Sequence, residues 1–253
     1  MTFSIIIPSF NQADYIEETL TSTLKLKSMA KEKGFEVEIL VFDSESNEQV
    51  QNVLRKYATQ LDKLEIKKDK GQYDAINKGI TACKGDYWTW LNTDDTLDAE
   101  GVLRLMQVLS LKPQTDYVYG GIDYINEQGQ IIRRFEPVAV NFQTLVTKVP
   151  GIFQQGSFFR TAFTKPLGLL KAYNCCFDYE FVLRCLQAGA KMEVCPFKVA
   201  NFRQHSLSKT GSITPVFIRE QLLISKDYGR KPWHFLSWFS QLRLIKHSLF
   251  PRT

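Results

Sequence analysis

Four consecutive oxygen-bearing side chains, Asn92 to Asp95, follow an aromatic run that extends from Tyr87 to Leu91. The run is typical of a buried strand. Two adjacent carboxylates, Asp94 and Asp95, repel each other unless a cation lies near them. Ligands of open α/β sheets bind at the carboxyl ends of the strands. The stretch therefore indicates a metal or phosphate site, although a turn with a helix cap also uses Asp and Thr.

Two further carboxylates stand at or near the ends of other apolar segments. Asp43 comes directly after the run 37–42, and Asp69 closely follows the short run 64–67. Parallel strands end at one edge of their sheet, so these side chains are expected near the Asn92–Asp95 stretch. Carboxylates gathered at one sheet edge suit ribose hydroxyls and a divalent ion.

The elements that must position these residues alternate between strand and helix. Strands are predicted at 3–8, 37–42, 64–67 and 87–91, and helices from about 14 to 33, 48 to 61, 73 onward and 99 to 111. This alternation predicts an α/β fold with a mostly parallel sheet flanked by helices. Neither G-x-G-x-x-G after the first strand nor G-x-x-x-x-G-K-[ST] is present, which argues against dinucleotide-binding and phosphate-loop folds.

The second half of the chain reads differently. A strand at 117–119 is expected to end at Gly120 and Gly121, followed by a hairpin over 122–135 that turns at "NEQG". Strand character returns at 151–160, and a helix is expected from about Asp178 to Gly189. One continuous domain is predicted over 1–212, with a helical extension at 213–253.

Composition excludes several classes. The 253 residues are 44% hydrophobic and 23% charged, with a formal charge of +5. The basic residues are scattered, which favours an anionic partner such as a nucleoside diphosphate or a lipid surface and argues against nucleic acid. Five cysteines without C-x-x-C spacing indicate reduced thiols in a cytoplasmic protein. The N-terminal run reads as a strand rather than a signal peptide, and no run reaches the length of a membrane span.

Six segments in order resemble the successive blocks of the bacterial family 2 glycosyltransferases. They are "SIIIPSFNQ", "VFDSESNE", "DKGQYDAINKGI", "GDYWTWLNTDD", "FQQGSFFR" and "FDYEFVLR". The resemblance covers about residues 3–210. It implies the GT-A fold, a nucleotide-diphosphate sugar donor and inversion at the anomeric carbon. It also divides the domain into a nucleotide-sugar-binding half, 1–120, and an acceptor half, 121–212.

The resemblance assigns roles residue by residue. Nucleotide-sugar binding is implied for Pro8, Ser9, Asn11, Asp43, Asp69, Gly71, Asp74, Asn77, Asn92 and Asp94. A Mg²⁺ or Mn²⁺ ion is implied at Asp95, Asp94 and His205, the general base at Asp178, and acceptor contacts at Gln155 and Gly156.

The sequence departs from the family pattern at two positions. Asn92 stands where the family often has Asp, which leaves metal binding to Asp94 and Asp95. Gln154 stands where the acceptor segment often has His. The Q-x-x-R-W motif of processive synthases is missing near the C-terminus, which favours transfer of a single sugar.

Non-catalytic interpretations exist for several of these residues. Asp178 could cap the helix that follows it, and Asp69 and Asp74 could be a turn residue and a cap. His205 could be an ordinary surface or core histidine.

The tail 231–253 places aromatic and aliphatic residues along one helical face with basic residues around it. Such a helix suits a membrane interface and a lipid-linked acceptor. It equally suits packing on the domain or on a second subunit, as in a homo-oligomer. Cytoplasmic location, with peripheral contact to the inner face of the cell membrane, is the corresponding expectation.

The leading hypothesis is an inverting, metal-dependent hexosyl- or N-acetylhexosaminyltransferase of surface polysaccharide assembly, acting on a glycan or lipid-linked acceptor. The alternative is a non-catalytic nucleotide-sugar or glycan-binding member of the same fold, because a fold does not establish a function. Asp178 argues against the alternative, since binding alone needs no base. A sugar nucleotidyltransferase would need a Gly-rich, basic loop after the first strand, which "PSFNQADY" does not provide.

Overall fold

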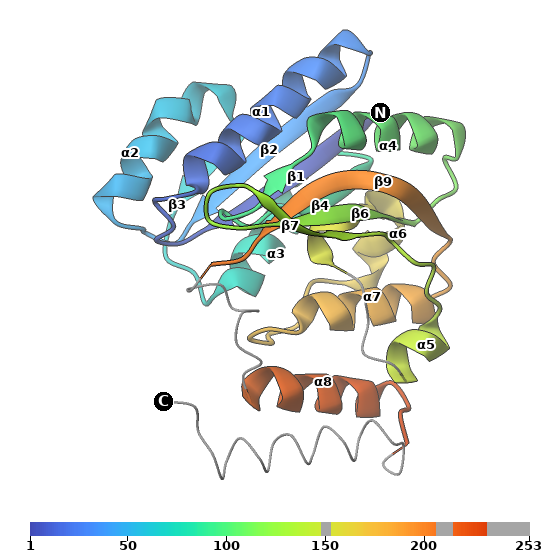
Figure 1. The fold of residues 1–253 in the computed structure, drawn as a ribbon. Coiled ribbons are helices and arrows are strands. Elements are labelled where there is room, and N and C mark those ends of the chain that lie inside the picture. The colour runs from blue at the N-terminus through green and yellow to red at the C-terminus, as the bar shows by residue number, and fades with distance from the viewer. Residues whose placement is uncertain (148–152, 206–214, 232–253) are drawn as a thin grey trace.

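The computed structural model (Figure 1) describes residues 1–147, 153–205 and 215–231. Its first part is the predicted strand–helix alternation, with bounds within a few residues of those expected. The elements are β1 (Thr2–Ser9), α1 (Ile16–Glu32), β2 (Glu36–Asp43), α2 (Glu48–Tyr57), β3 (Lys63–Ile66), α3 (Gln72–Ala82) and β4 (Tyr87–Trp90), with a 3₁₀ turn at Ala58–Gln60. The strands pair in parallel in the order β3-β2-β1-β4, so their carboxyl ends share one edge.

The second part adds antiparallel strands to this parallel core. Its elements are β5 (Thr96–Leu97), α4 (Ala99–Leu111), β6 (Tyr117–Ile125), β7 (Ile131–Phe135), α5 (Phe142–Thr147), β8 (Ser157–Arg160), α6 (Thr161–Thr164), α7 (Phe177–Gln187), β9 (Met192–Arg203) and α8 (Pro215–Asp227), with 3₁₀ turns at Gln154–Gly156 and Lys165–Leu167. β8 lies antiparallel between β4 and β6, and β9 runs parallel to β6 and antiparallel to β5. The α/β prediction is confirmed.

Helices cover both faces of the sheet. α1, α2 and α4 lie on one face, and α3 and α7 lie on the other, with α5 and α8 beyond α7 (Figure 1). Each face has its own apolar core: one joins the sheet to α1, α2 and α4, and the other joins it to α3, α5, α7 and α8. Strands covered on both faces explain the lack of polar alternation in β1, where Ile5, Ile6 and Ile7 are all fully buried.

The prediction that Gly120 and Gly121 end a strand is wrong, because β6 continues through them to Ile125. Both glycines allow β9 to approach closely. A Cβ on Gly120 would lie 2.6 Å from the Val199 side chain, and one on Gly121 would lie 3.1 Å from the Phe197 carbonyl oxygen. The pairing register slips at the same place, where β9 accommodates Pro196 in a bulge.

The expected amphipathic tail helix lies outside the described residues, except for Lys231. The described part of the C-terminal extension is α8, which packs against the cavity side of the domain rather than standing apart from it. Among the described helices, none combines the length and the apolar character needed to cross a bilayer.

Candidate active site

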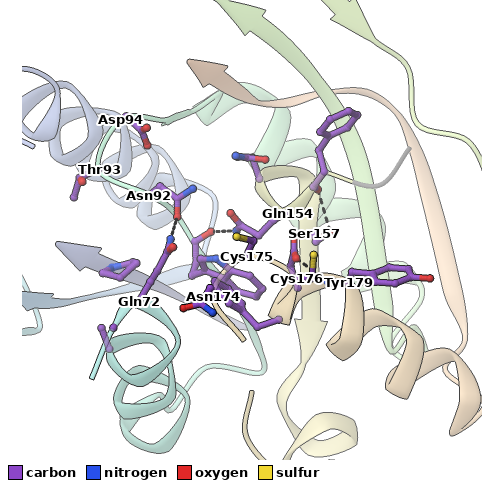
Figure 2. A pocket seen from close by; sticks show the side chains of 18 of the residues that line it. Gln72, Asn92, Thr93, Asp94, Gln154, Ser157, Asn174, Cys175, Cys176 and Tyr179 are labelled. Carbon is purple, nitrogen blue, oxygen red and sulfur yellow. Dashed lines mark hydrogen bonds between the residues drawn. The ribbon is translucent and has the colours of Figure 1, made fainter. Parts of the chain in front are cut away.

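A cavity of about 800 Å³ opens where the parallel strands end. Residues that follow β1, β2, β3 and β4 line one side of it, and residues from the 153–159 segment, the turn before α7 and helix α8 line the other. Figure 2 shows Gln72, Asn92 and Asp94 on one side and Tyr179 on the opposite side. The volume lies in the range of small-molecule sites.

The loop after β4 is held by amide hydrogen bonds. Asn92 Oδ1 accepts from Gln72 Nε2 at 2.6 Å, as Figure 2 shows, and Asn92 Nδ2 donates to Asp95 Oδ2 at 3.1 Å. A carboxylate at position 92 could accept from Gln72 but could not donate to Asp95. Asparagine therefore suits position 92 because its amide can donate a hydrogen bond to the Asp95 carboxylate, which a second carboxylate could not do.

Asp95 lies behind the cavity wall. Its side chain is fully buried and does not line the cavity. Oδ2 also accepts from Gln155 Nε2 at 2.8 Å, and Oδ1 accepts from the Arg203 backbone N–H at 3.0 Å. Burial and the nearby Asp94 charge raise the pKa of Asp95 well above its ordinary value, although the three N–H donors oppose this. In this structure the carboxylate holds β4, β9 and Gln155 together, and the metal contact expected at Asp95 stays a prediction.

Asp94 faces the cavity and meets His205. Asp94 Oδ2 lies 3.0 Å from His205 Nε2, and the histidine ring packs on Tyr15 with ring centroids 5.1 Å apart. The described residues contain no group of three or more His, Cys, Asp and Glu side chains arranged to hold a metal alone. One carboxylate and one imidazole still fit Mg²⁺ or Mn²⁺, because such ions in nucleotide sites take their remaining ligands from phosphates and water.

Arg203 organises this corner and was not predicted from the sequence. Its side chain is 1% exposed, and Nε donates to the Asp94 carbonyl oxygen at 3.0 Å. Nη1 donates to the carbonyl oxygens of Asn126 and Glu127, each at 3.1 Å, and Nη2 pairs with Glu18. In the sequence, Arg203 stands out only by its place two residues before His205. Its burial could not be foreseen, because arginine is rarely buried unless it is paired.

Asp178 also lines the cavity and lies in the first turn of α7. The helix begins at Phe177 with Cys176 as N-cap, so the alternative in which Asp178 is the cap is wrong by two residues. Asp178 Oδ1 accepts from the Tyr179 N–H at 2.7 Å. Burial raises the pKa of Asp178 to about 6, and the first-turn N–H groups only partly offset this. A carboxylate with this pKa can accept a proton near neutral pH.

The structure separates the other predicted residues into those that line the cavity and those that support it. Pro8, Ser9, Asp69, Gly71, Asn92, Asp94 and Gln155 line it. Asn11, Asp43, Asp74, Asn77 and Gly156 do not.

Asp43 and Asn11 support the loops that follow β1 and β2, and the nucleotide contacts expected of them stay predictions. Asp43 is buried and accepts from Ser9 Oγ at 2.8 Å and from the Ser46 N–H at 2.9 Å. Asn11 has a φ of 52° and accepts from the Asn47 N–H at 2.8 Å. Together they join the loops after β1 and β2, so that Ser9 reaches the cavity.

Asp74, Asn77 and Gly156 likewise make contacts within the fold, and the donor and acceptor contacts expected of them stay predictions. Asp74 accepts from the Lys70 N–H at 3.1 Å and so closes the turn before α3. Asn77 exchanges two hydrogen bonds with the backbone of Leu170, at 2.9 and 2.8 Å. Gly156 allows close approach to β6, because a Cβ there would lie 2.5 Å from the Gly120 carbonyl oxygen.

Gln154, for which sequence analysis gave no role, carries an unpaired group at the cavity. Its Nε2 donates to the Trp90 carbonyl oxygen, which fixes the orientation of the amide because that oxygen can only accept. Its Oε1 is buried and has no hydrogen-bond partner among the described residues. Gln154 lines the cavity, so a ligand hydroxyl or water can supply the missing donor.

Comparisons with known proteins agree with this geometry. A glycosyltransferase of Rickettsia felis is 31% identical over 140 residues, which are 54% of this chain and 22% of that protein. This chain thus matches about a fifth of that relative's length. The structure of S. aureus TarS with UDP-GlcNAc superposes with a TM-score of 0.68 at 18% identity, over 99% of this chain and 73% of that one.

A second solved structure is the mannosyltransferase PcManGT of Pyrobaculum calidifontis with GDP-Man and Mn²⁺. It superposes with a TM-score of 0.63 at 16% identity, over 96% of this chain and 69% of that one. These two likenesses show the fold. Residues 4–185 match the model of Glycosyl transferase family 2, which is well over half of the chain. The chain therefore belongs to glycosyl transferase family 2 and has the GT-A fold.

Proposed function

We propose that the protein transfers one sugar, with inversion, from a nucleoside-diphosphate sugar to a hydroxyl of a glycan or lipid-linked acceptor. The observation that carries the proposal is that Asp94, which pairs with His205, and Asp178 line the same cavity. The first pair suits a diphosphate, and Asp178 suits a reacting hydroxyl. A binding protein would need no carboxylate with a raised pKa at the second position.

The donor is proposed to bind along the strand ends, in the half formed by residues 1–120. Ser9, Asp69 and Asn92 offer polar groups there, and Phe10 lines the cavity while 61% of its surface is exposed. An exposed aromatic face at a cavity mouth can stack on a nucleobase. The bound UDP-GlcNAc of TarS and GDP-Man of PcManGT support a nucleotide sugar as the donor class.

Asp94 and His205 are the residues proposed to hold Mg²⁺ or Mn²⁺ beside the diphosphate. When bound, the ion would act as a Lewis acid that neutralises the charge growing on the leaving diphosphate. Asn92, Asp95 and Arg203 keep the Asp94 loop in place through the hydrogen bonds described above. Preorganisation of this kind is what lets fixed charges act in a transition state.

Asp178 is proposed to be the general base. It takes the proton of the acceptor hydroxyl as that oxygen bonds to the anomeric carbon. The bond from this carbon to the diphosphate oxygen breaks with its electron pair leaving on the diphosphate. Attack opposite the leaving group inverts the anomeric centre, and no covalent enzyme intermediate is required. The acceptor half is proposed to be residues 121–212, with Gln154 and Gln155 in its wall.

Replacing Asp94 by Ala is expected to abolish Mn²⁺-dependent nucleotide binding. A thermal-shift titration with UDP, GDP and dTDP, each with and without Mn²⁺, measures this. A ligand at a hundredfold excess over its Kd stabilises the fold by about 2.7 kcal/mol. The Mn²⁺-dependent part of that stabilisation should disappear in Asp94→Ala and persist in Glu100→Ala, which removes an exposed acid on α4. An unchanged shift in Asp94→Ala would refute the metal assignment.

Turnover is expected to rise with pH and to level off above about pH 6. The base must be ionised, and burial raises the pKa of Asp178 to about 6. Below that value kcat/KM should fall about tenfold per pH unit. Release of UDP or GDP from UDP-GlcNAc, UDP-glucose and GDP-mannose, with water as acceptor, provides the assay. A flat profile between pH 4.5 and 7 would contradict the assignment of Asp178.

A further inference from the structure

Helix α8 lies beyond the residues that match the family model and beyond the domain expected to end at residue 212, yet it forms part of the cavity wall. Phe217 and Gln221 line the cavity, and Ile224 joins the core beneath α7. The extension is therefore part of the site's surroundings. Glu220, on the same helix, accepts hydrogen bonds from the turn that precedes α7.

The Glu220 carboxylate accepts hydrogen bonds from three consecutive backbone N–H groups. Oε1 accepts from Asn174 N at 2.7 Å, and Oε2 accepts from Cys175 N at 2.9 Å and Cys176 N at 3.1 Å. The Asn174 side-chain amide adds a fourth bond, at 3.1 Å. Hydrogen bonds to an ionised acceptor are roughly twice as strong as neutral ones. Burial alone would raise the pKa of Glu220, but these backbone donors outweigh it and hold the pKa below its ordinary value.

The turn held in this way leads directly into Asp178. Cys176 is the N-cap of α7 and makes no side-chain capping bond. The N–H groups of Asn174, Cys175 and Cys176 find their acceptor in Glu220 of α8. A second tie fixes α8 to α7, since the Tyr228 hydroxyl donates to Glu180 Oε1 at 2.6 Å. The Cys176 thiol also donates to the Phe217 carbonyl oxygen at 3.6 Å. Figure 2 shows Asn174, Cys175 and Cys176 at the cavity, close to Gln154.

We propose that Glu220 is a positioning residue: by holding the Asn174–Cys176 turn, it sets the place from which α7 presents Asp178 to the acceptor hydroxyl. This inference rests on the proposed function. Glu220 touches no reacting atom and acts through the backbone. Displacement of a catalytic group by about 1 Å can cost about a hundredfold in rate, so loss of the contact should lower the rate more than it lowers donor binding.

Glu220→Ala removes all four acceptor contacts, and Glu220→Gln keeps one carbonyl oxygen that can accept. The assay measures nucleotide release from UDP-GlcNAc, UDP-glucose or GDP-mannose, whichever the parent turns over. We expect its kcat to fall about ten- to a hundredfold in Glu220→Ala. The loss should be smaller in Glu220→Gln. KM for the donor and the thermal shift with UDP should stay unchanged. Arg219→Ala, an exposed neighbour on α8, is the matched control and should retain the parent rate.

A second readout needs no turnover. Amide hydrogen exchange at residues 174–176 should accelerate in Glu220→Ala, as should alkylation of the Cys176 thiol, which is 1% exposed in the parent. An unchanged rate of amide exchange at residues 174–176 would show that Glu220 does not hold this turn. Faster exchange with an unchanged kcat, or a loss confined to KM, would overturn the positioning role. A parent without turnover on any donor would contradict the proposed function, while the exchange data would still decide whether Glu220 holds the turn.

Discussion

Asp178→Asn is expected to lower turnover by about 10²–10⁴-fold, the range that a positioned general base contributes. Asparagine has nearly the same shape, and its carbonyl oxygen can still accept from the Tyr179 N–H. It cannot take a proton from the acceptor hydroxyl. Because the ion is proposed to bind at Asp94 and His205 and not at Asp178, the Mn²⁺-dependent thermal shift with nucleotide should be unchanged.

The same substitution is expected to stabilise the folded protein at neutral pH. Folding raises the pKa of Asp178 from 3.8 to about 6, so between these values the folded state binds more protons than the unfolded state. Stability contributed by this group is therefore present at low pH and is lost as pH rises through about 6. Asn carries no charge to bury, which makes its advantage at pH 7 on the order of 2 kcal/mol.

A fall in turnover together with a rise in Tm would distinguish a catalytic carboxylate from a structural one, since loss of a structural carboxylate lowers both. The control is Asp227→Asn, which makes the same chemical change at an exposed position on α8. It should alter neither quantity. Full turnover in Asp178→Asn would refute the assignment of Asp178 as the base, whereas a parent protein without turnover on any donor would favour the nucleotide-sugar-binding alternative.

The nucleotide-binding half of the fold could be predicted because its signals are local. Each apolar run ends in a polar turn, and α4 spans the predicted residues 99–111. β9 was missed because Pro196 interrupts its pattern, and the strand tolerates the proline only through the bulge opposite Gly120 and Gly121. Such a fit between two strands about 75 residues apart has no signature in either segment alone.

The candidate site shows the same division. The sequence identified Asp94 and Asp95 as adjacent acids but could not tell which one faces the cavity. That choice is made by Gln155 and Arg203, which reach Asp95 from segments 60 and 108 residues away along the chain. Glu220 was missed for the same reason, since its partners at 174–176 lie 44 to 46 residues earlier. A family motif identifies the residues expected to contact the substrates. It does not identify the distant residues that position them.

Arg203→Leu is expected to destabilise the protein by about 3 kcal/mol or more. The carbonyl oxygens of Asp94, Asn126 and Glu127 would each lose a charged donor, and a hydrogen bond to a charged group contributes about 1.5–3 kcal/mol. The ion pair with Glu18 adds little to this sum, because the Glu18 side chain is 54% exposed. Since the Asp94 carbonyl is one of the three, the loop that presents Asp94 should also move.

Urea unfolding of the parent and Arg203→Leu measures the first effect, and the Mn²⁺-dependent thermal shift with nucleotide measures the second. Arg104→Leu is the matched control, because Arg104 is exposed and only stacks on Phe197 at 4.5 Å. Arg203→Lys should be intermediate, since one ammonium cannot reproduce the fork of the guanidinium. If Arg203→Leu unfolds at the same urea concentration as Arg104→Leu and keeps the Mn²⁺-dependent thermal shift, then Arg203 does not hold the Asp94 loop in place. Loss of both stability and metal-dependent binding would show that a residue outside the acidic motif determines which of its two carboxylates meets the ligand.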